Sequence, residues 1–181
     1  MLSRMLLFAL ILITGWSLPM PLTSQINTAG PSNYPLSEFA WVEEKLGQMT
    51  PDERIGQLFM VAAYSNRDEA HKQSIASIIR NHHIGGLIFM QGTPSKQIEL
   101  NNYFQAISKT PLLIAIDGEW GLSMRLKDTP KFPRQLMLGA IQNDRLLYDL
   151  GREMARQCQR IGVHVNFAPV VDVNNNANNP D

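Results

Sequence analysis

The chain has 181 residues, of which 44% are hydrophobic and 18% charged, a composition typical of a globular domain with a sizeable core. Sixteen basic residues balance sixteen acidic ones, which argues against nucleic acid or a strongly anionic surface as a partner. The single cysteine, Cys158, excludes an internal disulfide framework and a multi-cysteine metal site.

The first residues have the layout of a secretory signal peptide. Arg4 precedes an apolar run over residues 5–13 that is too short to span a bilayer, and prolines and small polar residues follow it. We therefore expect residues 1–24 to be a signal peptide and residues 25–36 a leader with little structure of its own. The protein is then exported to the periplasm or the extracellular space and keeps no stable membrane span after cleavage. An uncleaved N-terminal anchor is the alternative.

Helix and strand signals alternate from residue 37 onward. The sequence predicts four strands, over 59–64, 87–90, 111–116 and 163–168. Two helices precede the first strand, one over 37–49 and one from Pro51. The helices between the strands run from Asp68 towards Gly85, from Thr93 through Ile107 and from Asn143 to Gly162, and an irregular passage over 118–141 precedes the last of them. Thr50, Pro51 and Glu53 combine an N-cap, a first-turn proline and a capping-box glutamate. The short helix that they open should turn Ile55 and Leu58 inward.

Strands that are apolar throughout and alternate with helices favour parallel pairing with right-handed crossovers. A doubly wound sheet and a (β/α)8 barrel both fit this pattern. The absence of Gly-x-Gly-x-x-Gly after the first strand weakens the dinucleotide-binding version of the doubly wound sheet. Since a complete barrel needs about 250 residues, we expect an α/β fold of about four βα units, the N-terminal half of a (β/α)8 barrel, over residues 37–181.

Polar residues gather where the third predicted strand ends. The apolar run stops at Asp117, and Glu119, Trp120 and Arg125 follow within eight residues. Sites in α/β folds collect at the carboxyl ends of strands, so this stretch is the candidate site. The alternatives are structural: Asp117 caps its own loop, Glu119 serves nearby N–H groups or a lysine, and Arg125 is an exposed loop cation.

Residues 116–125 resemble glycoside hydrolase family 3, in particular its β-N-acetylhexosaminidase branch. Members of that branch show Asp-x-Glu-Gly-Gly followed by an arginine eight residues after the aspartate, the spacing of Asp117 and Arg125. Residues 49–58, 84–88 and 166–173 agree with the resemblance. Trp120 departs from it, because this place in the family pattern is usually glycine.

The resemblance implies a (β/α)8 barrel that acts as a retaining exo-glycosidase on terminal β-linked N-acetylglucosamine, without a metal or an organic cofactor. It implies that Asp117 and Arg125 bind hydroxyl groups of the terminal sugar. A carboxylate can accept two hydrogen bonds from vicinal hydroxyls, and an arginine can donate several in return. The candidate supporting positions around this pair are Glu119, Trp120, Asp172 and Asn174. For the last two, holding the asparagine-rich loop together is the alternative.

The family's acid/base histidine follows a Lys-His-Phe-Pro-Gly type motif, and its nucleophile is an aspartate on a later strand. This sequence contains neither stretch. Retaining hydrolysis needs both groups around one glycosidic bond, so we expect a truncated family member with no catalytic residue of its own, inactive as given. The alternatives are a fragment of a family 3 β-glucosidase and a non-catalytic sugar-binding half barrel.

His82 and His83 suggest a metal site, but adjacent residues at a helix end point in different directions and no third ligand is placed by spacing. We expect both to be surface residues. His164 should be packed or hydrogen-bonded within the fourth strand, and Cys158 should be a small core or boundary residue.

Overall fold

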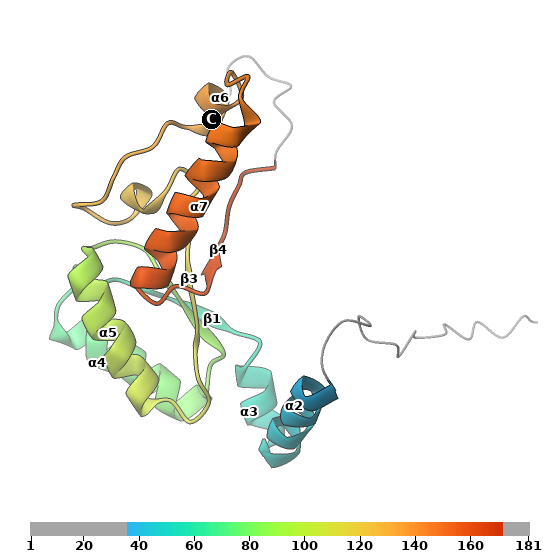
Figure 1. The fold of residues 1–181 in the computed structure, drawn as a ribbon. Helices are drawn as coiled ribbons and strands as arrows, with labels where there is room; N and C mark the ends of the chain where they lie inside the picture. Colours follow the sequence, from blue (N-terminus) through green and yellow to red (C-terminus); the bar gives the residue numbers. More distant parts are fainter. Residues whose placement is uncertain (1–35, 172–181) are drawn as a thin grey trace, which may run out of the picture. The chain divides into compact units, whose positions relative to one another are not determined.

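The structure, a computed structural model, describes residues 36–171, with side chains from residue 39 onward (Figure 1). The chain divides into two units, Met1–Glu43 and Glu44–Asp181, and helix α2 (Leu36–Gln48) contains the boundary. The sheet and the other helices belong to the second unit. The predicted signal peptide and nearly all of the predicted leader lie outside the described residues. Within the described range, no helix is both long and apolar enough to cross a membrane.

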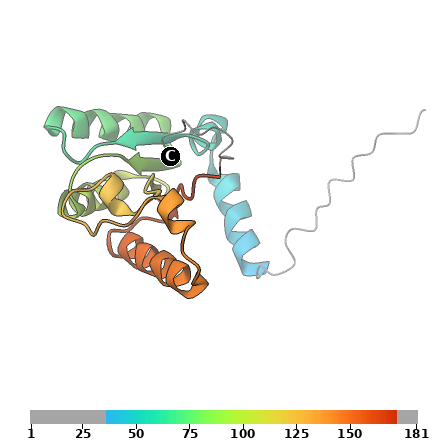
Figure 2. The same cartoon turned by 90° about the horizontal axis from the view of Figure 1, so that it is seen from above.

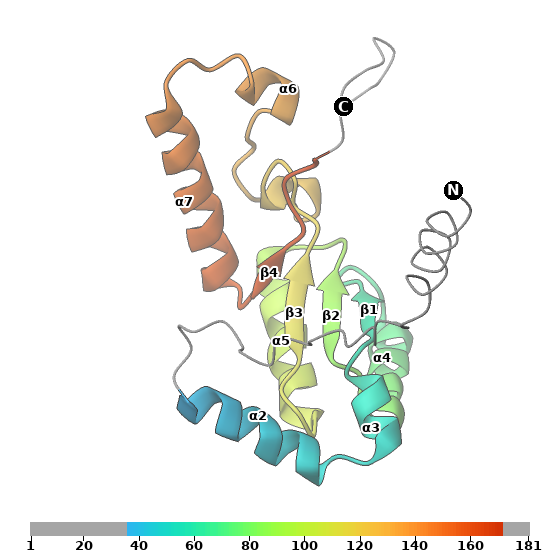
Figure 3. The same ribbon diagram turned by 90° about the vertical axis from the view of Figure 1, so that its right-hand side faces the viewer.

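Four parallel strands form one sheet in the order in which they occur in the chain (Figure 3). They are β1 (Met60–Ala63), β2 (Gly86–Phe89), β3 (Leu113–Ile116) and β4 (Val165–Asn166). Ala62 pairs with Ile88, Ile88 with Ala115, and Ala115 with Val165. Strands β1, β3 and β4 are shorter than predicted, most of all β4, which keeps two residues of the run over 163–168. Strand β2 has the predicted length and begins one residue earlier than expected.

A helix lies between each strand and the next. These helices are α4 (Glu69–His82), α5 (Pro94–Ile107) and α7 (Asp144–Arg160), and α3 (Pro51–Gly56) precedes β1. The long passage before α7 contains the short elements η1 (Leu122–Met124) and α6 (Gln135–Leu138). Figure 3 shows α4 and α5 behind the sheet, and in Figure 2 α4 runs alongside β1. Alternating strands and helices with parallel pairing confirm the predicted α/β class.

The hydrophobic core lies between these helices and one face of the sheet. Leu87, Phe89, Ile114 and Ile116 alternate along β2 and β3 on this face, and each is at most 1% exposed. The helices contribute Ile75, Ala76 and Ile79 from α4, Phe104 from α5 and Cys158 from α7. Burying one large apolar side chain contributes about 1.5–3 kcal/mol, so this layer holds the strands and helices together.

The opposite face of the sheet carries the residues that alternate with the core positions. Met60, Ala62 and Ile88 are partly exposed there, and Leu113 is 47% exposed. Both faces of a parallel sheet are normally covered. In a closed (β/α)8 barrel this apolar face lines the packed interior.

The capping signals predicted from the sequence are present at the helix starts. Thr50 Oγ1 accepts the Glu53 N–H over 3.2 Å, and the Glu53 carboxylate accepts the Thr50 N–H over 2.9 Å. Asp68, Thr93 and Asn143 cap α4, α5 and α7 through their side-chain oxygens. Because capping is a local interaction, these starts could be read from the sequence.

The prediction that Ile55 and Leu58 turn inward is wrong. Their exposed fractions are 55% and 84%, and Glu53 and Gly56 are the buried residues of α3. The capping box turns Glu53 towards the protein, and Gly56 then packs against the carbonyl groups that end α4. A β-carbon on Gly56 would overlap the carbonyl oxygen of His82, so this contact requires glycine.

Candidate functional site

Asp117 and Arg125 are in direct contact at the carboxyl end of β3. Asp117 is the first residue after the strand, and Arg125 follows η1, which returns the chain towards the strand end. Arg125 Nη2 donates to the Asp117 carboxylate, and Arg125 Nε donates to the Asp117 backbone carbonyl oxygen over 2.8 Å. The Asp117 and Arg125 side chains are 26% and 20% exposed, so solvent reaches the pair only in part.

The pair keeps hydrogen-bonding capacity beyond its own contact. Within the described part of the chain, no residue donates to Asp117 Oδ1 and none accepts from Arg125 Nη1. A carboxylate oxygen accepts and a guanidinium nitrogen donates, whereas a hydroxyl group can do both. The pair therefore offers an acceptor and a donor to a ligand that carries neighbouring hydroxyl groups.

Asn166 of β4 holds the loop that follows Asp117. Its Oδ1 accepts the Gly118 N–H over 2.9 Å, and its Nδ2 donates to the Gly118 carbonyl oxygen over 3.1 Å. The side chain thus links β4 to Gly118, two residues beyond the last paired residue of β3. The sequence reasoning assigned no role to Asn166. Two signals pointed to this position, an amide side chain in an otherwise largely apolar run and its place at the start of the stretch 166–173 that agrees with the family resemblance.

Gly121 makes the turn between β3 and η1 possible. Its N–H donates to the Gly118 carbonyl oxygen over 2.9 Å, and its φ is 94°. A β-carbon at this position would lie 2.6 Å from the Phe132 ring. Both the backbone conformation and the close contact favour glycine, so the shape of the loop depends on this residue.

The two neighbouring candidates, Glu119 and Trp120, contact the N-cap and the first residue of α6. The Glu119 carbonyl oxygen accepts a hydrogen bond from Gln135 Nε2 over 2.7 Å, and the Arg134 guanidinium lies 4.8 Å from the centre of the Trp120 ring. These contacts fix the loop and do not involve Asp117. Asp172 and Asn174 lie outside the described residues.

The three histidines and the cysteine singled out in the sequence all lie within the described residues. His82 is exposed, whereas His83 is partly buried, with Nε2 3.8 Å from the Glu53 carboxylate. His164 is hydrogen-bonded as predicted, because its Nδ1 accepts the Ile114 N–H over 2.9 Å. Cys158 is 8% exposed, which confirms its core role, and burial raises the pKa of its thiol. Over residues 36–171, no three His, Cys, Asp or Glu side chains are grouped to hold a metal ion.

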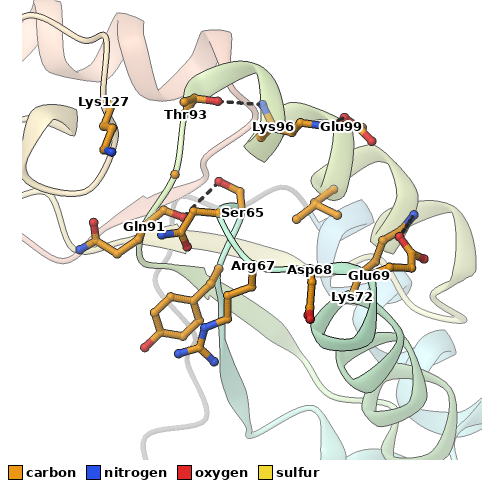
Figure 4. A pocket seen from close by; sticks show the side chains of 14 residues that line it. Ser65, Arg67, Asp68, Glu69, Lys72, Gln91, Thr93, Lys96, Glu99 and Lys127 are labelled. Carbon is orange, nitrogen blue, oxygen red and sulfur yellow. Dashed lines mark hydrogen bonds and ion pairs between the residues drawn. The ribbon is translucent and has the colours of Figure 1, made fainter.

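Three cavities of the second unit have polar groups in their lining, and two of them lie near the carboxyl ends of the strands. The first, of about 500 Å³, lies between the loops after β1 and β2 and the first turns of α4 and α5 (Figure 4). The second, of about 680 Å³, lies between α7 and β4 and includes Glu119 and Asn166 in its lining. Asp117 and Arg125 line neither of these two cavities.

Known proteins resemble this chain in sequence and in fold. This chain is 27% identical over 153 residues to a β-N-acetylglucosaminidase/β-glucosidase of Cellulomonas fimi, and the alignment covers 84% of this chain and 26% of the relative. It is also 33% identical over 120 residues to β-hexosaminidase A of Pseudoalteromonas piscicida, and this alignment covers 59% of this chain and 20% of the relative. The chain thus spans a fifth to a quarter of the length of these relatives.

The fold matches a solved structure of the β-glucoside phosphorylase BglX with a TM-score of 0.72 at 22% identity, over 79% of this chain and 25% of that chain. This likeness concerns the fold and confirms the predicted part of a (β/α)8 barrel. The model of the glycosyl hydrolase family 3 N-terminal domain matches residues 50–181, which confirms the resemblance recognised in the sequence. The chain belongs to glycoside hydrolase family 3.

Proposed function

We propose that this chain is the sugar-binding part of an exported retaining exo-glycosidase that removes terminal β-linked N-acetylglucosamine. In this proposal Asp117 and Arg125 bind hydroxyl groups of the terminal sugar. The observation that carries it is the contact of these two residues at the carboxyl end of β3, at the spacing of the family motif. The names of the two relatives, a β-N-acetylglucosaminidase/β-glucosidase and a β-hexosaminidase, support the sugar class.

The chemistry of the pair suits a sugar better than a simple ion. A free anion would compete with the Asp117 carboxylate for Arg125, and a free cation would compete with Arg125 for Asp117. A hydroxyl group avoids this competition, since it can donate to Asp117 Oδ1 and accept from Arg125 Nη1. Each hydrogen bond to a charged group contributes about 1.5–3 kcal/mol, so two of them give a useful share of the binding free energy.

Hydrolysis requires groups other than this pair. A retaining mechanism needs a nucleophile and an acid/base group on either side of the glycosidic bond. The family resemblance assigns these roles to stretches that the 181 residues do not contain. We therefore propose that the chain by itself binds the sugar without hydrolysing it.

Binding and hydrolysis can be tested together on the 181-residue chain. Titration with N-acetylglucosamine, followed by amide NMR, should give saturable shifts at Asp117, Gly118 and Arg125. The same preparation should release no nitrophenol from 4-nitrophenyl N-acetyl-β-glucosaminide. Asp117→Asn should remove the shifts and leave the protein folded. Saturable binding that is unchanged in Asp117→Asn, or no binding at all, would contradict the proposed site.

A β-glucosidase is the second candidate, because the Cellulomonas fimi relative carries both activities in its name. Titration with glucose separates the two. If glucose binds as tightly as N-acetylglucosamine, or more tightly, the β-glucosidase is favoured. A longer protein that includes this chain gives a second test, since faster cleavage of an aryl glucoside than of an aryl N-acetylglucosaminide also favours the β-glucosidase.

Export rests on residues 1–24 alone and is tested separately. Fused to a reporter phosphatase that is active only outside the cytoplasm, this segment should give activity and a shortened mature protein. Retention of an inactive fusion inside the cell would contradict export. A fusion that is active but keeps its full length would identify the segment as an uncleaved anchor.

A further inference from the structure

The cavity between α4 and α5 is built by three separate parts of the chain. The loop after β1 contributes Ser65 and Arg67, the loop after β2 contributes Gln91 and Thr93, and Lys127 comes from the segment that follows η1. Figure 4 shows Ser65 and Gln91 between Lys127 on one side and Arg67 on the other. The volume of the cavity, about 500 Å³, is within the usual range for small-molecule sites.

Hydrogen bonds join the three segments that form the wall of the cavity. The Ser65 N–H and hydroxyl both donate to the Gln91 carbonyl oxygen, over 2.9 and 3.2 Å. Gly92 exchanges backbone hydrogen bonds with the third segment, donating to the Arg125 carbonyl oxygen over 3.3 Å and accepting from the Lys127 N–H over 2.9 Å. A β-carbon on Gly92 would overlap the Ser65 hydroxyl, so the close approach of the segments needs glycine. The lining is therefore preorganised.

Most charges in the lining neutralise each other. Lys72 pairs with Glu69 over 3.3 Å, and Lys96 pairs with Glu99 over 3.1 Å. The third carboxylate, Asp68, caps α4 by accepting the His71 N–H over 3.1 Å.

Two cations of the lining have no carboxylate partner among the described residues. The Arg67 guanidinium lies 3.8 Å from the centre of the Tyr64 ring, and Lys127 is exposed. Neither forms an ion pair with a described residue. Four cations and three carboxylates line the cavity, so the net charge of the lining is +1. The charges outside the two ion pairs are those of Arg67, Lys127 and Asp68.

Neutral hydrogen-bonding groups separate these two cations. Asn66, Gln91 and Thr93 offer amide and hydroxyl groups, and the Tyr64 ring adds an apolar surface. A fully ionised inorganic anion can accept hydrogen bonds from the cations and the amide N–H groups, but it has no donor for the amide oxygens. A sugar with an anionic substituent matches the whole lining, since its hydroxyl groups meet the amides and its charge meets Arg67 or Lys127.

We propose that this cavity is a second binding site, separate from the Asp117–Arg125 pair, for a saccharide that carries an anionic group. Carboxylate and phosphate sugars share this chemistry. The site does not depend on the proposed glycosidase function, because neither Asp117 nor Arg125 lines the cavity.

The test is a set of titrations of the 181-residue chain, followed by amide NMR at low salt. The probes are glucuronate, glucose 6-phosphate, glucose and inorganic phosphate. At least one of the two anionic sugars should shift the amides of Ser65, Gly92 and Lys127 with a dissociation constant in the millimolar range or below. Glucose and inorganic phosphate should bind at least tenfold more weakly. The sugar with the higher affinity, glucuronate or glucose 6-phosphate, shows whether the site prefers a carboxylate or a phosphate group.

Substitutions assign the binding to the cavity. Arg67→Met with Lys127→Met should weaken binding of the anionic sugar at least tenfold, whereas Lys131→Met, an exposed lysine outside the cavity, should not change it. If the double variant does not fold, Lys127→Met alone carries the test and should weaken binding at least threefold. Asp117→Asn should leave this binding intact, so failure of the Asp117–Arg125 site remains distinguishable.

Three results would overturn the proposal. They are no saturable shift with either anionic sugar, equal affinity for glucose or for inorganic phosphate, and unchanged affinity when Lys127 is replaced by methionine. Raising the sodium chloride concentration should also weaken binding, since an exposed charge pair is screened by salt.

Discussion

Arg125 contacts Asp117 at two points, the side-chain carboxylate and the backbone carbonyl oxygen. The guanidinium can do this because its Nε and Nη2 donors lie in one plane and point in similar directions. The double contact fixes the orientation of both residues at the end of β3. A lysine would keep the charge but has a single ammonium group, and it could not hold the two oxygens in the same geometry.

Arg125→Lys should therefore reduce the affinity for N-acetylglucosamine at least tenfold and lower the free energy of unfolding by about 1 kcal/mol. Calorimetric titration and urea denaturation measure the two effects. The matched control is Arg145→Lys, since Arg145 pairs with Asp149 over 3.0 Å on an exposed face of α7. The control should change neither quantity. Wild-type affinity in Arg125→Lys would remove Arg125 from the proposed site.

Asn166→Asp tests the side chain that links β4 to the loop after β3. The substitution places a carboxylate oxygen where Nδ2 now donates to the Gly118 carbonyl oxygen over 3.1 Å. Two acceptors then face each other, and the free energy of unfolding should fall by about 1–3 kcal/mol. Asn102→Asp, on an exposed part of α5, is the control and should change it by no more than about 0.5 kcal/mol. Equal effects of the two substitutions would show that the Gly118 contact contributes little.

Gly121→Ala tests the turn before η1. The substitution meets a φ of 94° and the Phe132 ring at 2.6 Å, so we expect a loss of about 2 kcal/mol or more in the free energy of unfolding. Phe132→Ala should recover part of this loss in the double variant, because it removes the overlap and leaves the backbone strain. Gly151→Ala in α7 is the control. A β-carbon there meets no atom within 4 Å, so it should stabilise the helix by about 0.5–1 kcal/mol. Additive losses for Gly121 and Phe132 would mean that the ring does not restrict this position.

The order of the elements could be predicted from the sequence because its signals are local. Thr50, Asp68, Thr93 and Asn143 each cap the helix predicted for them, and the apolar runs give the four strands. That Asp117 and Arg125 lie close together at the end of β3 could also be expected, since both belong to one recognised motif. Their direct ion pair was not predicted.

Contacts between distant parts of the chain could not be predicted in this way. The inward face of α3 depends on the contact between Gly56 and the end of α4. The role of Asn166 depends on a partner 48 positions away. The cavity with Arg67 and Lys127 needs three loops that meet only when the sheet has formed. Each of these features is set by packing, which a single sequence does not reveal.

Glu53 gives the protein a predictable response to acid. The residue is 7% exposed, and its carboxylate is paired with Lys109 and accepts the Thr50 N–H. The hydrogen bond from Lys109, followed by that from Thr50, lowers the pKa of Glu53 from 4.5 to about 2. A carboxyl group whose pKa is lower in the folded state stabilises that state above its unfolded pKa. This contribution is lost as the pH falls from 4.5 towards 2.

The midpoint of thermal unfolding should therefore decline as the pH is lowered from 5 to 2, and Glu53→Gln should flatten part of this decline. Glutamine keeps the size of the side chain but does not titrate, so the variant should be less stable than the wild type at pH 6 and approach it near pH 2. Other carboxylates also contribute, such as Glu153, whose pKa is lowered to about 2 by the hydrogen bond from Arg156, but they act equally in both proteins. Glu99→Gln, at an exposed pair with Lys96, is the control and should behave like the wild type. Thermal melts at half-unit pH steps measure the difference. A decline as steep in Glu53→Gln as in the wild type would show that the Glu53 carboxylate does not determine the acid response.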